Sequence, residues 1–267
     1  EKYQKNNKEV MDFCEGYKDY ISVAKTERIA VKEAVKLLDA KGFKNIDKVS
    51  SVKEGDKVYF INKNKNVAAY IIGKKPLDAG LRILGAHIDS PRLDLKEHPI
   101  YEKSGFALGD THYYGGVKKY QWVTIPLALH GVVCKKDGSV IEVNIGEDPK
   151  DPVVGITDLL IHLSADQMAK TLGKAIEGEN LDVTLGNMPL GEERDAVKAN
   201  VLKLLKEKYG VEEEDFISAE IEVVPAGPAR DYGLDRSMIA GYGHDDRSCA
   251  YTSLMAILDT DKVENTA

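Results

Sequence analysis

Two patterns of apolar residues near the amino-terminal end of the chain recur every three to four positions, the spacing of an amphipathic helix. The first pattern covers residues 7–24. The second runs from about Thr26 to Lys41, where Thr26 suits the N-cap and Gly42 the position at which a helix ends. We therefore predict two ordinary packing helices in this part of the chain.

The next part of the chain favours strands. Residues 58–61 and 67–72 are rich in β-forming side chains and flank the polar turn 62–66, which predicts a hairpin. A short apolar run at 81–84 indicates a buried strand. This predicted strand leads directly into residues 85–91, whose sequence is GAHIDSP.

After Asp94 the pattern changes to short strand-forming runs separated by turns and helical stretches. We predict, in chain order, a polar and flexible loop at 110–116, strands within 121–134 and at 140–145, a helix over 164–176, a loop over 177–191, a helix over 192–209 and a strand with one solvated face over 218–224.

Composition excludes several classes of protein. The chain has 267 residues, enough for two domains or one large one, and its 43% hydrophobic and 30% charged residues are typical of a soluble globular protein. A net charge of -7 argues against nucleic acid or an anionic membrane surface as the main partner. No apolar run approaches the roughly 18 residues that a membrane span needs.

The three cysteines are widely spaced and odd in number, so they predict no disulfide framework and suit a reducing, cytoplasmic compartment. The polar start of the chain does not resemble a signal peptide. The first residue is not Met, and we expect the chain to be a piece of a longer polypeptide.

The stretch 85–91 is the first candidate for chemistry. A strand followed by glycine and His-x-Asp can present a metal ligand at the carboxyl edge of an α/β sheet. His87 would then be the ligand, and Asp89 would orient its imidazole ring. The alternative is a histidine whose hydrogen bonds are satisfied within a turn.

The second candidate is the stretch 241–247, with the sequence GYGHDDR, which precedes an apolar-periodic helix. An aspartate at such a turn can bridge two metal ions, because its two carboxylate oxygens reach both ions. The start of the helix would add a positive dipole near that charge. The alternative is a solvated acidic turn.

Together the two stretches resemble the aspartyl aminopeptidase and vacuolar aminopeptidase I family of zinc metallopeptidases. The interior runs GGVKKYQWVTIPLALHG, DLLIHLSADQ and EIEVVPAGPARDYGLDRSMIAGYGHDDR are similar to the bacterial members, and the resemblance covers essentially the whole chain. It implies an α/β fold, in which a phosphorylase/hydrolase-like three-layer αβα metallopeptidase domain (residues 1–95 and 236–267) is interrupted by a β-rich dimerisation domain (residues 96–235).

The resemblance also implies roles for particular residues. His87 matches a terminal metal ligand, Asp89 the catalytic aspartate that orients it, and Asp245 the aspartate that bridges two ions, with Asp246 as its neighbour. His162 is similar to a histidine that reaches the active site of the neighbouring subunit. For His162 the alternative is a core histidine.

The implied function is that of a metalloaminopeptidase, which removes the N-terminal residue of peptides with a water activated by two zinc ions. Homo-oligomers, dimers and in some members dodecamers, are implied as well. The family's general-base glutamate and its remaining metal ligands are expected beyond Ala267. We therefore expect the 267 residues alone to be inactive. The alternatives are a carboxypeptidase or deacylase of the same clan and a non-catalytic assembly protein.

The N-terminal residue that such an enzyme would prefer, acidic or apolar, is not predicted by the sequence. An acid-selective pocket would need a cation, and four residues are candidates: Arg92, Lys118, Lys119 and Arg247.

Overall fold

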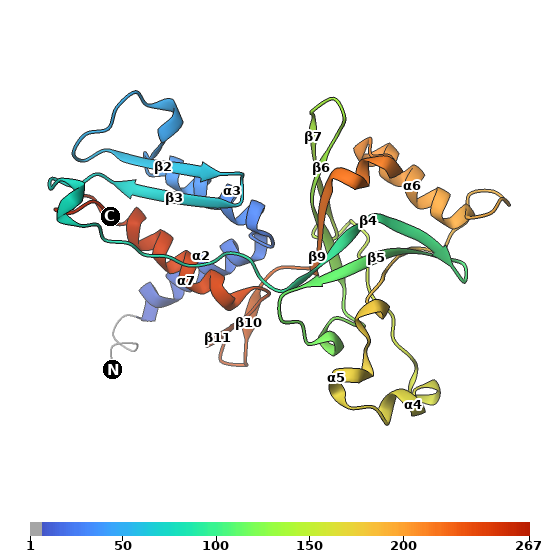
Figure 1. Ribbon diagram of the computed structural model, residues 1–267. Helices are drawn as coiled ribbons and strands as arrows, with labels where there is room; N and C mark the ends of the chain where they lie inside the picture. The colour runs from blue at the N-terminus through green and yellow to red at the C-terminus, as the bar shows by residue number, and fades with distance from the viewer. Residues whose placement is uncertain (1–6) are drawn as a thin grey trace. The chain divides into compact units, whose positions relative to one another are not determined.

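The computed structural model describes residues 7–267, which form two compact units (Figure 1). Unit 1 contains the residues up to Ser90 together with Pro228–Ala267, and unit 2 contains Pro91–Gly227. Both helices and sheets occur, so the predicted α/β class is confirmed. Among the described residues, no helix is both long and apolar enough to cross a membrane.

Unit 1 combines helices with a small sheet. Its elements are α2 (Asn7–Val23), α3 (Glu27–Ala40), β1 (Lys44–Asn45), β2 (Lys57–Asn62), β3 (Asn66–Ile71), β10 (Arg230–Tyr232), β11 (Met238–Ala240) and α7 (His244–Leu258). Strand β2 pairs parallel with β1 and antiparallel with β3, and β10 and β11 form a separate antiparallel pair. The two predicted helices and the predicted hairpin are confirmed, and Thr26 caps α3 by accepting a hydrogen bond from the Ile29 amide.

The core of unit 1 holds α7 against the hairpin. Leu38 of α3, Ile71 of β3 and Leu258 of α7 belong to one buried cluster. A second cluster joins Tyr20 of α2 to Tyr251 of α7. Since full burial of one such side chain contributes about 1.5–3 kcal/mol, these clusters fix the position of α7 relative to α2, α3 and the hairpin.

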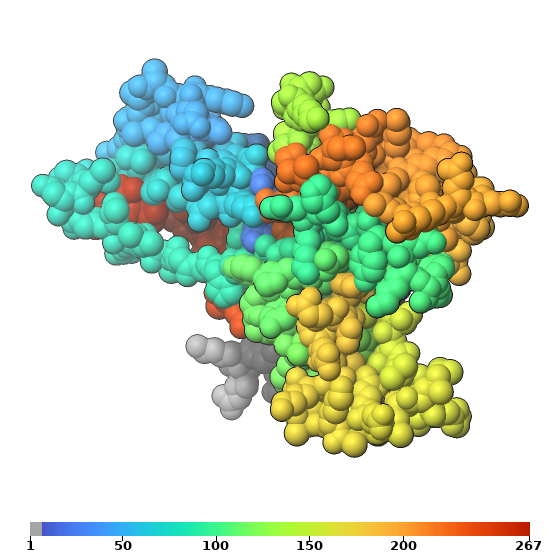
Figure 2. All heavy atoms as spheres, turned by 45° about the vertical axis from the view of Figure 1, so that its right-hand side comes forward, coloured from blue at the N-terminus to red at the C-terminus, as the bar shows by residue number. Residues whose placement is uncertain are grey.

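The predicted strand at 81–84 is wrong, because these residues form no strand in the structure. Leu81, Ile83 and Leu84 are 48%, 80% and 68% exposed. Figure 2 shows the turquoise atoms of this part of the chain on the outside of unit 1. A strand needs neighbours that accept and donate its backbone hydrogen bonds, and within residues 7–267 the only such bond in this run is from the Arg82 amide to the Thr266 carbonyl.

Unit 2 is built on one antiparallel sheet of six strands in the order β7-β6-β9-β4-β5-β8 (Figure 1). The strands are β4 (Arg92–Lys103), β5 (Phe106–Tyr114), β6 (Leu127–Cys134), β7 (Val140–Ile145), β8 (Val183–Gly186) and β9 (Ala219–Pro225), and the helices are α4 (Ala165–Met168), α5 (Leu172–Ala175) and α6 (Ala196–Tyr209).

Three predictions for unit 2 need correction. Residues 110–114 belong to strand β5 and do not form a loop. In β5, Tyr114 lies opposite Arg92, and its ring lies 4.3 Å from the Arg92 guanidinium. The helix predicted over 164–176 is divided into α4 and α5, and the Ser164 hydroxyl donates to the Ile161 carbonyl instead of capping α4. The loop predicted over 177–191 contains β8.

Strand β9 is also more buried than its alternating sequence predicts. Ile221, Glu222 and Val223 are all buried, so the strand has no solvated face at its centre. The Glu222 carboxylate lies 3.2 Å from the Arg92 guanidinium, which compensates the charge that Glu222 carries into the sheet.

Leu38→Ala tests the packing of unit 1. Leu38 is fully buried, so the substitution should lower the free energy of unfolding of unit 1 by about 2–5 kcal/mol through lost burial and the cavity it leaves. Leu77→Ala, at a position that is 66% exposed, should change it by less than about 0.5 kcal/mol. Hydrogen exchange of amides in α3 and β3 with increasing urea measures both values, and equal effects of the two substitutions would contradict this packing.

Candidate metal site

The first turn of α7 places the acidic residues of the second candidate stretch. Gly243 precedes the helix with φ +86°, a conformation that side chains rarely adopt. A Cβ atom at this position would also lie 2.0 Å from the Arg247 guanidinium. Asp245 and Asp246 follow with non-helical backbone angles and a cis peptide bond between them. The Asp245 side chain is 94% exposed.

Three of the predicted site residues meet at this turn. The His87 Nε2 atom lies 3.2 Å from Asp245 Oδ1. On the other side of the ring, His87 Nδ1 lies 3.1 Å from both the carboxylate and the carbonyl oxygen of Asp89. Because these Asp89 oxygens only accept, Nδ1 must carry a proton and donate. The Nε2 atom is therefore the one that can bind an ion in the neutral ring.

The two carboxylates control the charge of His87. Burial lowers its pKa, but hydrogen bonds with Asp89 and Asp245 together outweigh this and raise the pKa above its ordinary value. A histidine between two carboxylates therefore holds a positive charge readily. The same two carboxylates would also stabilise a metal cation that takes the place of the proton on Nε2.

The separation of His87 Nε2 and Asp245 Oδ1 fits shared coordination. Two ligand atoms about 2.0–2.1 Å from one tetrahedral zinc ion lie about 3.3 Å apart, close to the 3.2 Å observed. Two ligands alone do not make a tight site. Within residues 7–267, no group of three or more His, Cys, Asp or Glu side chains is arranged to hold a metal ion.

Asp246 has surroundings different from those of Asp245. A hydrogen bond with Asp246 is the largest cause that raises the pKa of the Cys249 thiol, one turn further along α7. The adjacent aspartates thus separate: Asp245 faces His87, while Asp246 interacts with its own helix.

Arg247 connects the two candidate stretches. Its side chain is only 1% exposed, its Nε–H donates to the Ile88 carbonyl at 3.1 Å, and its Nη2–H donates to the Lys25 carbonyl at 2.9 Å. The Ser90 hydroxyl adds a second connection by donating to the Asp245 carbonyl at 3.0 Å. Arg247 therefore holds residues 87–90 against the start of α7 and sets the distance between His87 and Asp245.

This role of Arg247 is not predicted by the sequence. Arg247 was expected only as a candidate cation for an acidic substrate, whereas in the structure its guanidinium is buried and donates to backbone carbonyls. Arg92 is buried as well, with Asp94 and Glu222 as partners. A signal was present in the sequence, since Arg247 directly follows the predicted ligands, but its spacing does not indicate that it bonds to distant carbonyls.

His244 belongs to the scaffold of the site. Its Nε2 lies 3.1 Å from the Ile239 carbonyl, which can only accept, so Nε2 donates and Nδ1 accepts from the Tyr17 hydroxyl at 2.9 Å. Burial raises the pKa of Tyr17 to about 12, which keeps the hydroxyl protonated as this hydrogen bond requires. Both ring nitrogens of His244 are therefore occupied by hydrogen bonds within unit 1.

His162 lies in unit 2, in a short turn of 3-10 helix (Ile161–Leu163), and is exposed. The alternative of a core histidine is therefore wrong. Its neighbours Leu160, Ile161 and Leu163 are 69%, 67% and 70% exposed.

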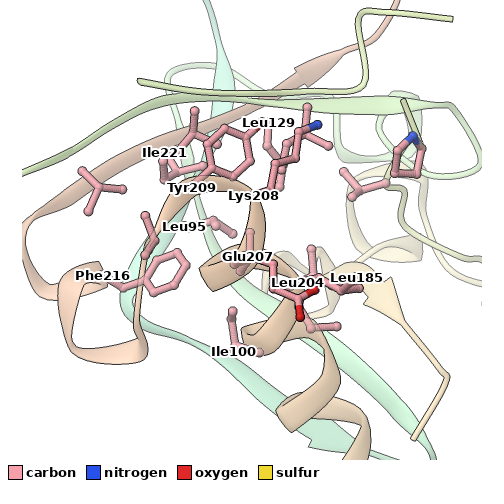
Figure 3. Close-up of a pocket in the computed structure, with 18 of the residues that line it drawn as sticks. Leu95, Ile100, Leu129, Leu185, Leu204, Glu207, Lys208, Tyr209, Phe216 and Ile221 are labelled. Atoms are coloured by element: carbon pink, nitrogen blue, oxygen red, sulfur yellow. The ribbon is translucent and has the colours of Figure 1, made fainter. Parts of the chain in front are cut away.

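A separate cavity of about 470 Å³ lies between α6 and the sheet of unit 2 (Figure 3). Leu95, Leu129, Leu204, Phe216 and Ile221 are among its apolar lining residues. None of the predicted site residues lines it, and its two charged residues, Glu207 and Lys208, do not form a catalytic arrangement. This cavity is thus not a candidate for the chemistry that the two sequence stretches predict.

Comparisons with known proteins match most of the chain. The family model described as Aminopeptidase I zinc metalloprotease (M18) matches residues 20–267. A probable M18 family aminopeptidase 1 of Clostridium acetobutylicum is 53% identical over 98% of this chain, and its counterpart in Thermotoga maritima is 48% identical over 96%. The chain spans only 58% and 56% of the lengths of these two relatives.

Solved structures agree with these matches. The crystal structure of the M18 family aminopeptidase from Thermotoga maritima has a TM-score of 0.94 and 47% identity, and covers 99% of this chain and 58% of that one. The S. cerevisiae mApe1 dodecamer has a TM-score of 0.73 at 20% identity, with 96% of this chain and 59% of that one covered. The latter likeness concerns the fold alone.

Arg247→Met tests the connection between the two stretches. The substitution leaves the Lys25 and Ile88 carbonyls without their donors, so the free energy of unfolding of unit 1 should fall by about 2–4 kcal/mol. Arg236→Met, at a side chain that is 75% exposed, should change it by less than about 0.5 kcal/mol. Hydrogen exchange of α7 amides with increasing urea measures both, and an unchanged Arg247→Met variant would contradict this role.

Proposed function

Because the chain belongs to the M18 family of aminopeptidase I zinc metalloproteases, we propose that it supplies part of the active site of an enzyme that removes N-terminal residues from peptides. The observation that carries this proposal is the 3.2 Å approach of His87 Nε2 to Asp245 Oδ1, with Asp89 on the opposite ring nitrogen. This geometry supports a metal site at the place where the two stretches meet.

Each of the three residues has its own task in this proposal. His87 and Asp245 would hold zinc at this site, and a carboxylate such as that of Asp245 could serve two ions. Asp89 accepts the Nδ1–H of His87, which fixes the ring orientation and makes Nε2 a stronger ligand. When bound, the zinc ions lower the pKa of water and polarise the carbonyl of the peptide.

In this proposal, the general base and the remaining metal ligands come from outside the 267 residues. Proton transfer from water to the leaving amine needs a general base, and a pair of zinc ions needs more ligands than His87 and Asp245. We assign both to the part of the longer relatives that has no counterpart here. The 267 residues alone are then inactive.

The proposal includes assembly into homo-oligomers. The exposed apolar residues around His162, among them Leu159, Leu160 and Ile161, form the kind of surface that marks a protein contact. Figure 2 shows yellow atoms of this region on the surface of unit 2. A second copy that covers these side chains would bury His162 with them, as a contact near the partner's active site requires.

Three free cysteines, Cys14, Cys134 and Cys249, support a reducing compartment such as the cytoplasm as the place of action.

The ligand assignment is tested in a chimaera that joins this chain to the remaining part of the Clostridium acetobutylicum relative. His87→Gln should lower release of amino acids from aminoacyl β-naphthylamides by about a thousandfold or more, since it removes a metal ligand. Asp89→Asn should lower the rate about 10–100-fold because only the orientation of His87 is lost.

The zinc content of each variant is measured by mass spectrometry alongside these assays. His98→Gln, at an exposed histidine of unit 2, is the matched control and should retain full activity and full zinc content. Zinc content and activity that survive in His87→Gln would refute the assignment. If the chimaera cleaved only substrates that report release of a carboxyl-terminal residue, a carboxypeptidase of the same clan would be favoured.

The proposed inactivity of the isolated chain is tested separately. A homogeneous sample of the 267 residues with added zinc should release no amino acid above the level of the buffer, because this proposal assigns the general base to the part of the longer relatives that has no counterpart here. Release that is abolished by a chelator would contradict the prediction.

A further inference from the structure

We propose that the cavity between α6 and the sheet of unit 2 binds one uncharged, chain-like apolar molecule of the class of linear aliphatic alcohols. All residues that line the cavity belong to unit 2, whereas His87 and Asp245 belong to unit 1. The inference therefore does not depend on the proposed peptidase activity.

The cavity is larger than a packing defect. Protein interiors are close-packed, and voids larger than a water molecule are few. The volume between α6 and the sheet is about 470 Å³, and pockets that hold small molecules generally measure about 300–1,000 Å³. The space thus has the size of a ligand site.

The register of the strands explains why this space is open. Gly131 of β6 lies opposite Val143 of β7 on one side and Ile221 of β9 on the other. It brings no side chain into this row, and none could be added, because a Cβ atom would lie 1.8 Å from the Glu220 carbonyl oxygen. Glycine inside a strand often marks such a close approach of backbone or ligand. The row therefore has a gap at the middle of the sheet.

The cavity is elongated across the sheet. Its lining includes Val143 of β7, Leu129 of β6, Ile221 of β9 and Leu95 of β4, four consecutive strands of the sheet, while Leu204 lines it from α6 (Figure 3). Neighbouring strands are about 4.8 Å apart, so three spacings extend over about 14 Å. A volume of about 470 Å³ over this length leaves a cross-section on the order of 30 Å². These dimensions suit an extended chain better than a globular molecule.

The walls of the cavity are apolar. Val133, Phe216 and Ile221 are buried and line it together with further aliphatic side chains. Water is held in a cavity only where it finds two to four polar partners, whereas apolar cavities stay dry and bind apolar molecules. Leu204 and Val153, which also line the cavity, are 55% and 53% exposed and mark the side from which a ligand enters.

The charges of the lining favour an uncharged ligand. The Lys208 ammonium donates to the Asp151 carboxylate at 3.0 Å, and the Glu207 carboxylate lies 3.7 Å from the Lys203 ammonium. An anionic head group beside Lys208 would have to displace Asp151 and would also meet the carboxylate of Glu207. Like charges at such short distances repel, so a fatty acid fits this site less well than an alcohol of the same length.

Titration of the 267-residue chain with decanol tests the proposal. Calorimetry should show one molecule bound per chain with a negative change in heat capacity, the mark of buried apolar surface. In methyl NMR spectra, the signals of Leu129, Val201 and Ile221 should shift, whereas that of Leu160, on the exposed apolar surface around His162, should not. Decanoate at neutral pH should bind at least about tenfold more weakly than decanol.

Val143→Phe and Val201→Phe fill the cavity from the sheet and from α6, respectively. Each should raise the Kd for decanol by at least about tenfold, while the circular dichroism spectrum shows that the variant is folded. Val140→Phe is the matched control, because this β7 residue is 56% exposed and does not line the cavity. It should leave the Kd unchanged.

Xenon tests the cavity without any substitution. In crystals of the unmodified chain under xenon pressure, an anomalous peak should lie between α6 and the sheet, since apolar cavities take up xenon. A chain that takes up neither xenon nor decanol at this place would overturn the proposal.

Three further results would also contradict it. These are decanol shifts at the Leu160 methyls without shifts at Leu129 and Ile221, decanoate binding as tight as decanol binding, and an unchanged Kd in folded Val143→Phe and Val201→Phe variants. None of these measurements uses catalysis, so failure of the proposed peptidase activity would leave the inference standing.

Discussion

The arrangement of unit 1 around its candidate site depends on the buried guanidinium of Arg247. Its bonds to the Ile88 and Lys25 carbonyls join three segments that are far apart in the sequence: the run 87–90, the turn before α3 and the first turn of α7. The side chain is only 1% exposed, and two of its three nitrogens, Nε and Nη2, donate to these carbonyls, while Nη1 has no hydrogen-bond partner among the described residues. These bonds hold the exposed His87 opposite the exposed Asp245.

The sequence predicted best where structure is local. The cap of α3 by Thr26 follows from the preferences of a helix end, and the hairpin follows from two strand patterns around a polar turn. The sequence predicted less well where the local structure depends on contacts with residues that are distant in the sequence. Residues 110–114 look like a loop until β4 pairs with them, and Glu222 looks solvated until Arg92 neutralises it. The run 81–84 has strand-forming side chains, but among residues 7–267 its one backbone hydrogen bond is that from the Arg82 amide to the Thr266 carbonyl.

In the candidate site, too, some residues were predicted from the sequence and others were not. His87, Asp89 and Asp245 were predicted from two short stretches and a family resemblance, and the structure brings these three together. The roles of Arg247 and Ser90 were not predicted, because both act through backbone carbonyls, whose positions no residue pattern specifies.

The central claim is that His87 and Asp245 share one zinc ion, and anomalous diffraction at the zinc edge tests it most directly. In crystals of the chain joined to the remaining part of the Clostridium acetobutylicum relative, a zinc peak should lie about 2.0–2.2 Å from both His87 Nε2 and an Asp245 carboxylate oxygen. A fully loaded protein in which no zinc peak touches His87 would contradict the account.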